Sequence, residues 1–219
     1  MTKQASPGSD EYADYARALK IILSWRTSPE RLPEDFAGWE PGHWNSGAGM
    51  KEISFDDHMP LVRQAILEFY PLPANFKLWD MLVSSESGWR TVSHIAATRG
   101  YPFPEGFGHW ALKNSAGEPV IHTLIRNFNV PPAHFTQWSI STEGHTAAHA
   151  YLRRLKRPLP ESFNEWLLGD RFGVTVAECA ILMSSEMKND SICSLPKDRE
   201  LWLRSIEIDT TLFHLGVRS

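Results

Sequence analysis

The chain has 219 residues, of which 42% are apolar and 22% are charged, and its formal net charge is −4 at pH 7. This composition is that of an ordinary globular protein, and no stretch approaches the roughly 18 uninterrupted apolar residues of a membrane-spanning helix. The small negative charge provides no global attraction for nucleic acid or anionic lipid. The first residues lack a secretory signal, and Cys179 and Cys193 form no disulfide framework, so we expect a cytoplasmic protein with reduced thiols.

Two helices are expected in the first third of the chain. Residues 9–25 carry apolar side chains at spacings of three and four, which predicts an amphipathic helix. Residues 56–70 predict a second helix, with Asp57 as its N-cap and Pro60 in its first turn. Residues 40–52 are rich in glycine and lack periodicity, which indicates a loop.

The pattern Pro-x-x-Phe-x-x-Trp recurs along the chain. Its copies begin at Pro33, Pro73, Pro104, Pro132 and Pro160, and a degenerate copy begins at Pro196. From Trp79 to Trp166 the tryptophans of successive copies are 31, 28 and 28 residues apart, a period typical of a repeat array. Proline suits the first turn of a helix, so we predict that each copy is a short helix with its Phe and Trp on one buried face. The expected core residues are Phe107, Trp110, Phe135, Trp138, Phe163 and Trp166.

A second motif lies between these copies. A glycine is followed two or three residues later by Thr or Pro, and three residues further by His94, His122, His149 or, breaking the pattern, Glu178. The motif, most clearly in residues 88–100, resembles the start of an ankyrin repeat, although the usual ankyrin unit has about 33 residues.

The resemblance covers roughly residues 55–185 and looks like a shortened bacterial-type variant. It implies an all-α protein, a right-handed α-solenoid of short ankyrin-like helix-turn-helix repeats. Residues 1–54, a helix and the glycine-rich loop, would cap one end. Residues 186–219 would form a C-terminal cap or tail, helical up to about Ile206.

The recurring histidines raise the question of a metal site. Side chains one repeat apart would lie about 10 Å from each other, too far for one zinc ion with ligands near 2 Å. In ankyrin-like repeats these residues form hydrogen bonds, so we expect no metal at His94, His122 and His149. His109, His134 and His145 are expected to be solvated. No phosphate loop, nucleophile elbow or zinc signature is present, so we expect neither enzymatic activity nor a cofactor, with an enzyme lacking a recognisable motif as an alternative.

The resemblance also implies which residues contact a partner, because the end of the first helix of each ankyrin unit faces the concave side. These positions are Thr98, Arg99, Arg126, Asn127, Arg153 and Arg154, with Arg157 just beyond. Trp89 and Trp44, which lie outside the helical pattern, are added as contact candidates. Arginines in register suit carboxylates or phosphates, although a solvated basic face is the plainer alternative.

The sequence therefore predicts a non-enzymatic protein-binding module, a bacterial or mobile-element adaptor or inhibitor that contacts an acidic surface through this arginine stripe. The alternative is a nucleic-acid or nucleoprotein binder that places the same arginines on phosphates. The two predictions differ in their dependence on salt. No membrane partner is expected.

Overall fold

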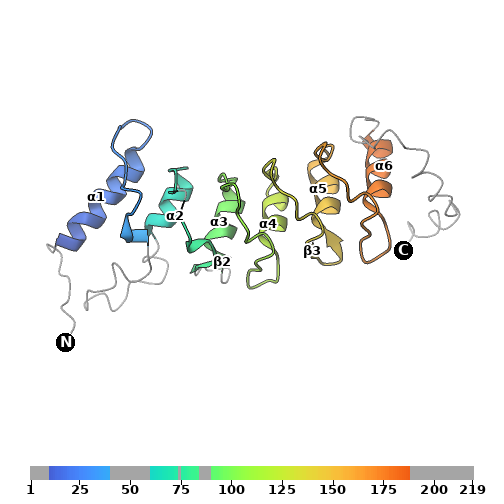
Figure 1. Cartoon of the computed structure of the whole chain (residues 1–219), viewed down its shortest axis with the longest axis horizontal. Coiled ribbons are helices and arrows are strands. Elements are labelled where there is room, and N and C mark those ends of the chain that lie inside the picture. The colour runs from blue at the N-terminus through green and yellow to red at the C-terminus, as the bar shows by residue number, and fades with distance from the viewer. Residues whose placement is uncertain (1–9, 40–59, 74, 84–89, 188–219) are drawn as a thin grey trace, which may run out of the picture. The chain divides into compact units, whose positions relative to one another are not determined.

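Figure 1 presents a computed structural model of the chain, which describes residues 10–39, 60–73, 75–83 and 90–187. These residues form six α-helices, two single turns of 3-10 helix and two small antiparallel hairpins of paired strands. Two further hairpin turns, residues 113–119 and 169–175, are each closed by a single β-bridge, between Lys113 and Pro119 and between Gly169 and Thr175. The protein is mostly helical, and the hairpins correct the expectation of an all-α chain. Trp44, Trp89, Asp57, Cys193, the degenerate copy and the tail lie outside the described residues.

The chain divides into two compact units, residues 1–132 and 133–219. Unit 1 contains α1 (Asp10–Ser24), η1 (Ala37–Trp39), α2 (Pro60–Leu67), η3 (Leu78–Asp80), β1 (Leu82–Val83), β2 (Arg90–Thr91), α3 (Val92–Arg99) and α4 (Val120–Arg126). Unit 2 contains β3 (Ser141–Thr142), β4 (His145–Thr146), α5 (Ala147–Leu155) and α6 (Val176–Met187). The helices α1 and α2 confirm the two helices predicted in the first third of the chain.

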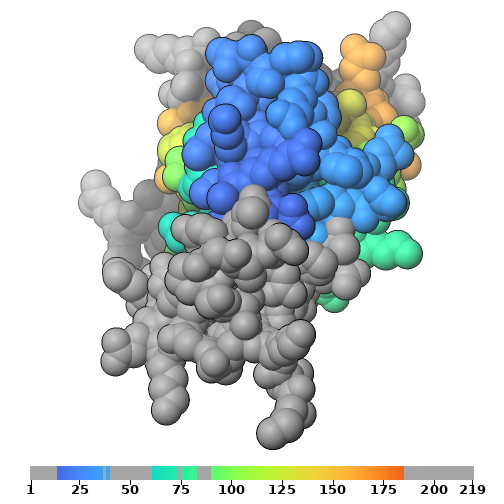
Figure 2. All heavy atoms as spheres, turned by 90° about the vertical axis from the view of Figure 1, so that its left-hand side faces the viewer, coloured from blue at the N-terminus to red at the C-terminus, as the bar shows by residue number. Residues whose placement is uncertain are grey.

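Consecutive helices pack together inside each unit. In unit 1, α1 packs against α2, α2 against α3, and α3 against α4, while α5 packs against α6 in unit 2. The first helix and the segment that follows it, drawn in blue, form the upper part of the side that Figure 2 turns toward the viewer. Strand β1 pairs with β2 directly before α3, and β3 pairs with β4 directly before α5.

The Pro-x-x-Phe-x-x-Trp segments are pairs of turns, so the prediction that they are short helices was wrong. In the copy that begins at Pro104, the Phe107 N–H donates to the Pro104 carbonyl and the Leu112 N–H donates to the His109 carbonyl, both at 3.1 Å. Among the copies that the structure describes, only the first two form a turn of 3-10 helix, η1 and η3. Segments this short gain too few internal hydrogen bonds to offset the cost of helix nucleation.

The prediction that these segments supply the core is confirmed. All six predicted Phe and Trp side chains of the last three copies are buried, and none is more than 6% exposed. Each Phe meets the Trp of its own copy edge to face, with ring centroids 4.6 Å apart for Phe107 and Trp110 and 5.0 Å apart for Phe163 and Trp166. This is the arrangement that aromatic pairs prefer.

The tryptophan segments also fix where the helices begin. At α5, the Ala147 N–H donates to the Ile140 carbonyl at 2.8 Å and the Ala148 N–H donates to the Trp138 carbonyl at 3.3 Å. At α6, the first two N–H groups bond in the same way to the carbonyls of Leu168 and Trp166. These N–H groups have no partner within their own helix, so the segment before each helix satisfies them.

Candidate functional site

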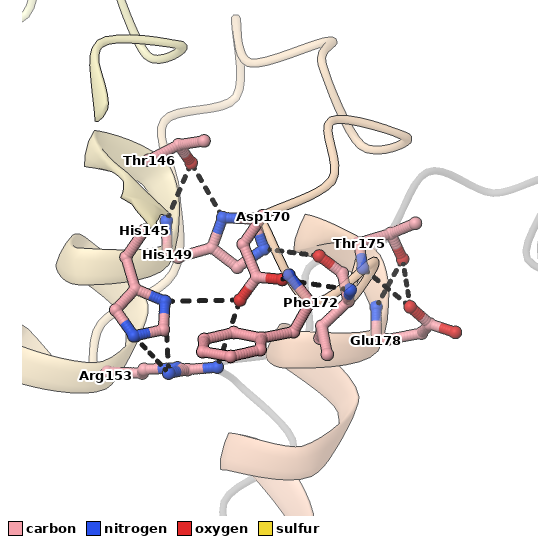
Figure 3. Close-up of polar contacts among 9 residues, drawn as sticks. His145, Thr146, His149, Arg153, Asp170, Phe172, Thr175 and Glu178 are labelled. Atoms are coloured by element: carbon pink, nitrogen blue, oxygen red, sulfur yellow. Dashed lines mark hydrogen bonds and ion pairs between the residues drawn. The ribbon is translucent and has the colours of Figure 1, made fainter. Parts of the chain in front are cut away.

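A buried threonine and histidine connect α5 to the hairpin that follows it. Thr146 Oγ1 lies 2.7 Å from His149 Nδ1, and His149 Nε2 lies 2.9 Å from the Val174 carbonyl oxygen (Figure 3). Because a carbonyl only accepts, Nε2 carries the proton, and in the neutral ring Nδ1 accepts from the threonine hydroxyl. Burial lowers the pKa of His149 and outweighs the bond to Val174, which acts to raise it.

Unit 1 repeats this arrangement at the start of α3. Thr91 Oγ1 lies 2.7 Å from His94 Nδ1, and His94 Nε2 lies 3.0 Å from the Glu118 carbonyl oxygen. Burial again lowers the pKa of the histidine. The prediction of hydrogen-bonded, structural histidines is confirmed for these two residues. His122 is also buried but follows Pro119 in place of a threonine. Within the described ranges, no three His, Cys, Asp or Glu side chains form a group that could hold a metal ion.

The last described helix, α6, carries a different cap. Glu178 Oε2 accepts from the Thr175 N–H at 2.6 Å and from the Thr175 hydroxyl at 2.9 Å, while the Glu178 N–H donates to Thr175 Oγ1 at 3.2 Å. This reciprocal pair is a capping box. The residue that breaks the histidine pattern therefore makes a different bond. His149 bonds to the next hairpin, whereas Glu178 bonds within its own helix end.

Two of the predicted contact arginines make ion pairs. Arg126 Nη2 lies 2.9 Å from Glu118 Oε2, and the arginine side chain remains 57% exposed. Arg153 Nη2 lies 3.7 Å from Asp170 Oδ2, and its Nη1 lies 3.4 Å from both ring nitrogens of His145. A guanidinium has five N–H donors, so one carboxylate leaves others for a ligand. These pairs reduce the positive charge at the predicted surface without removing it.

The remaining predicted contact residues differ in their surroundings. Arg99, Arg154 and Arg157 are exposed, whereas Thr98 and Asn127 are half-buried. The Thr98 hydroxyl donates to the His94 carbonyl at 2.8 Å, and Asn127 Nδ2 donates to the Thr123 carbonyl at 2.7 Å. These two polar side chains therefore bond to their own helices. Arg99 and Arg126 belong to unit 1 and the other three arginines to unit 2, and the continuous concave stripe stays a prediction.

Sequence reasoning missed a polar cluster around Asp170 in unit 2. The Asp170 side chain is fully buried, and Oδ1 accepts from the N–H groups of Phe172 at 2.8 Å and Val174 at 3.1 Å. Its Oδ2 lies 3.2 Å from His145 Nδ1, so the expectation that His145 is simply solvated was wrong (Figure 3). Burial acts to raise the pKa of Asp170, but the two N–H bonds and the neighbouring imidazoles lower it overall.

Asn114 occupies the corresponding place in unit 1. Its Oδ1 accepts from the N–H groups of Ala116 and Glu118, both at 3.0 Å, two and four residues further on, as Asp170 does. Each residue stands three positions before a glycine with positive φ, Gly117 or Gly173. This spacing of Asn or Asp and Gly is the signal from which the hairpins could have been predicted.

In unit 2, the β3–β4 hairpin and the hairpin turn at residues 169–175 are joined at their tips. The Arg171 N–H donates to the Gly144 carbonyl at 2.9 Å, and the Arg171 side chain lies so close to Gly144 that a Cβ there would collide with it. The Arg171 guanidinium carbon lies 4.6 Å from the centre of the Phe172 ring, and the His145 ring lies 5.8 Å from it. Phe172 itself is 63% exposed. The tips therefore present an aromatic ring beside cationic and imidazole groups.

Comparison of the chain with protein families, curated proteins and solved structures finds no match. Among the described helices, none combines the length and the apolar character that crossing a bilayer requires.

Proposed function

We propose that this chain is a non-enzymatic protein-binding module whose exposed arginines contact an acidic surface of a partner. The observation that carries the proposal is the recurrence of arginine in the last turn of α3, α4 and α5, at Arg99, Arg126, Arg153 and Arg154. All four are exposed. Bidentate pairing with carboxylates is the interaction for which arginine is best suited.

The finer architecture that we propose is a right-handed solenoid of short ankyrin-like repeats. It is supported by the hairpin and threonine cap before α3 and α5, by the histidine in the first turn of each of these helices, and by the packing of consecutive helices within each unit. In such an array the motif residues satisfy one another's hydrogen-bonding groups. The exposed side chains at helix ends and hairpin tips are therefore left for recognition of a partner. An adaptor or inhibitor would use such a surface without any chemical step.

A plainer explanation is that the arginines stabilise their own helices. Cations in a last helical turn interact favourably with the helix dipole, by about 0.3–1 kcal/mol each at exposed sites. Arg126 and Arg153 also have their ion pairs. A stabilising role predicts lower stability on substitution, whereas a recognition role predicts lost binding with the fold intact.

The test is a comparison of two charge-reversed variants of the whole chain. In the first, Arg99, Arg126, Arg153 and Arg154 become Glu. In the matched control the same change is made at four exposed basic residues elsewhere, Lys20, Arg63, Lys77 and Lys113. Proteins captured from the native host by the wild type and the control, but not by the first variant, would support the proposal. Equal capture by all three would contradict it, provided that circular dichroism and melting show intact folds.

A salt series separates the alternative of nucleic-acid binding by the same arginines. Binding to phosphates falls log-linearly with salt, because neutralising each phosphate releases bound counterions. We expect the captured material to be protein, to survive nuclease treatment and to show a shallower dependence on salt. Capture that is lost after nuclease treatment would favour the nucleoprotein alternative.

A further inference from the structure

We propose that the hairpin tips of unit 2 form a specific contact site, in which Phe172 with Arg171, Arg153 and His145 receives an acidic segment of a partner protein that carries an apolar side chain beside its carboxylates. The inference rests on the proposed function and adds a place and a chemistry to it. It moves the centre of recognition in unit 2 from the end of α5 to the neighbouring hairpin tips.

The hairpin does not need a phenylalanine for its own fold. Asn114 in unit 1 makes the same two backbone bonds as Asp170, yet the position two residues further on is Ala116 there and Phe172 here. Phe172 is 63% exposed, so its ring contributes little burial to the unit. Aromatic residues and arginine are enriched in protein–protein interfaces, and here the exposed Phe172 ring lies against the Arg171 guanidinium.

The ring is also held in place before any partner arrives. Its backbone N–H is fixed by the buried Asp170 carboxylate, and the Arg171 N–H is fixed by the Gly144 carbonyl of the other hairpin. The guanidinium of Arg171 lies 4.6 Å from the ring centre. Anchoring the backbone in advance reduces the ordering entropy that binding would otherwise require.

The charge around the ring favours a carboxylate ligand. Arg171, which lies at the ring, and Arg153, which lies at Asp170, are both exposed, whereas the Asp170 carboxylate is fully buried. A partner therefore meets the outward-facing cations. An extended phosphate backbone is less suited, because the exposed Glu143 lies at the tip of the joined hairpin. Separate carboxylates on a peptide can approach the arginines and avoid that glutamate.

Arg153 can exchange its contacts within the chain for a contact with a bound carboxylate. Its contacts with Asp170 and His145, at 3.7 and 3.4 Å, are longer than the 2.7–2.9 Å of a strong charged hydrogen bond. An incoming carboxylate can therefore compete for it. Removing the charge of Asp170 should then strengthen binding, and Asp170→Asn is the suitable change because Asn114 supports the same backbone bonds in unit 1. A merely structural role for Asp170 predicts no such gain.

Fluorescence anisotropy with the full-length chain tests the site. The probe is a short fluorescein-labelled peptide of glutamates around a central Leu-Phe pair. Two control peptides replace the glutamates by lysines or the Leu-Phe pair by alanines. We expect the probe to bind more tightly than both. Phe172→Ala should weaken it about tenfold or more, Asp170→Asn should tighten it severalfold, and Leu167→Ala, which removes an equally exposed side chain in the same unit, should leave it unchanged.

Equal affinity for the three peptides, no binding of the probe, or an unchanged Phe172→Ala variant would overturn the proposal. So would tighter binding of single-stranded DNA than of the probe, because that result assigns the tips to nucleic acid. The outcome is separable from that of the proposed function. If host proteins are lost with the four arginine substitutions but retained by Phe172→Ala, the arginine surface stands and the hairpin site does not.

Discussion

The two described helices of unit 2, α5 and α6, begin in the same way and differ in one capping side chain. In α5 and α6, the carbonyls of a preceding tryptophan segment accept the first two N–H groups, and a threonine hydroxyl accepts the third. The residue that donates the third N–H is His149 in α5 and Glu178 in α6. His149 reaches forward to the Val174 carbonyl, 25 residues away, whereas Glu178 reaches back to Thr175. The shared bonds fix where a helix starts, and the differing side chain decides whether that start is coupled to the next hairpin.

This difference shows that the histidine is the residue of the repeat that couples one helix to the following hairpin. His94 in unit 1 makes the same forward bond to the Glu118 carbonyl. A histidine at this position thus requires a following hairpin, since otherwise its buried Nε2–H has no acceptor. A glutamate needs nothing beyond its own helix. Helices with the histidine should therefore lose stability when the neighbouring hairpin is disturbed, and a helix with the glutamate should not.

The largest expected effect tests the tryptophan segment that precedes both α5 and α6. Trp138 is 4% exposed, and its ring contacts Phe135, Tyr151 and Phe163 at centroid distances of 4.8–5.8 Å. Trp138→Ala should lower the free energy of unfolding by about 3–5 kcal/mol, the usual loss for a large aromatic residue removed from a core. Urea unfolding followed by circular dichroism measures it.

Two controls accompany this measurement. Trp166→Ala should produce a similar loss, because Trp166 is equally buried and also supplies a helix with a carbonyl. The exposed Leu167→Ala should change stability by no more than about 0.5 kcal/mol. Unchanged unfolding of Trp138→Ala would show that the tryptophan segments do not hold the helices.

The next effect breaks the forward bond. His149→Ala removes a fully buried ring and leaves the Thr146 hydroxyl and the Val174 carbonyl without their partner. We expect a loss of about 2–3 kcal/mol, from unsatisfied buried polar groups together with a small cavity. The exposed His134→Ala in the same unit is the control and should unfold like the wild type. Hydrogen exchange should speed up in residues 169–175 of His149→Ala, and unchanged exchange there would contradict the coupling.

Acid should weaken the same bond without any substitution. The folded pKa values of His94 and His149 are lowered from 6.5, so between their folded and unfolded values the unfolded chain binds more protons than the folded one. Stability from these residues is therefore complete above about pH 6.5 and is lost as the pH falls below it. The stability that comes from the lowered pKa of Asp170 is complete above its ordinary value of 3.8 and is lost only as the pH falls below that value.

Urea midpoints measured between about pH 7.5 and 5 give the size of this effect. The slope should become shallower in His149→Gln, where His94 alone remains of the pair. A midpoint independent of pH in the wild type would mean that neither buried histidine resists protonation.

Much of the buried framework could be predicted from the sequence, because it repeats. The positions of Trp110, Trp138 and Trp166 in the core follow from their period, and the roles of His94 and His149 follow from the resemblance to ankyrin repeats. The path of the segments that carry the tryptophans could not be predicted, because spacings of three over six residues suit two turns as well as two helical turns. The deciding bonds run from the tryptophan carbonyls to helices about ten residues further on.

The candidate site was harder to predict than the core. Exposure of Arg99 and Arg154 follows from helix phase, but the pairing of Arg153 with Asp170 depends on which hairpin lies beside α5. The only sequence pattern that points to the cluster at Asp170 is the spacing of Asp170 and Gly173. This spacing is recognised as a hairpin turn only by comparison with Asn114 and Gly117. The Thr175 and Glu178 pair matches the capping-box pattern, so the sequence alone was sufficient to predict it.

The smallest effect concerns this capping box and completes the comparison. Glu178→Ala removes the acceptor for the Thr175 N–H and hydroxyl, at a half-buried helix end where water can replace it, so the loss should be about 1 kcal/mol. Glu178→Gln keeps an acceptor oxygen in the same place and should lose only about a few tenths of that energy. Neither variant should alter hydrogen exchange in residues 169–174, because the bonds of Glu178 go only to Thr175 at its own cap. If Glu178→Ala destabilises the chain as much as His149→Ala does, the two caps are equivalent and the forward bond of the histidine has no special role.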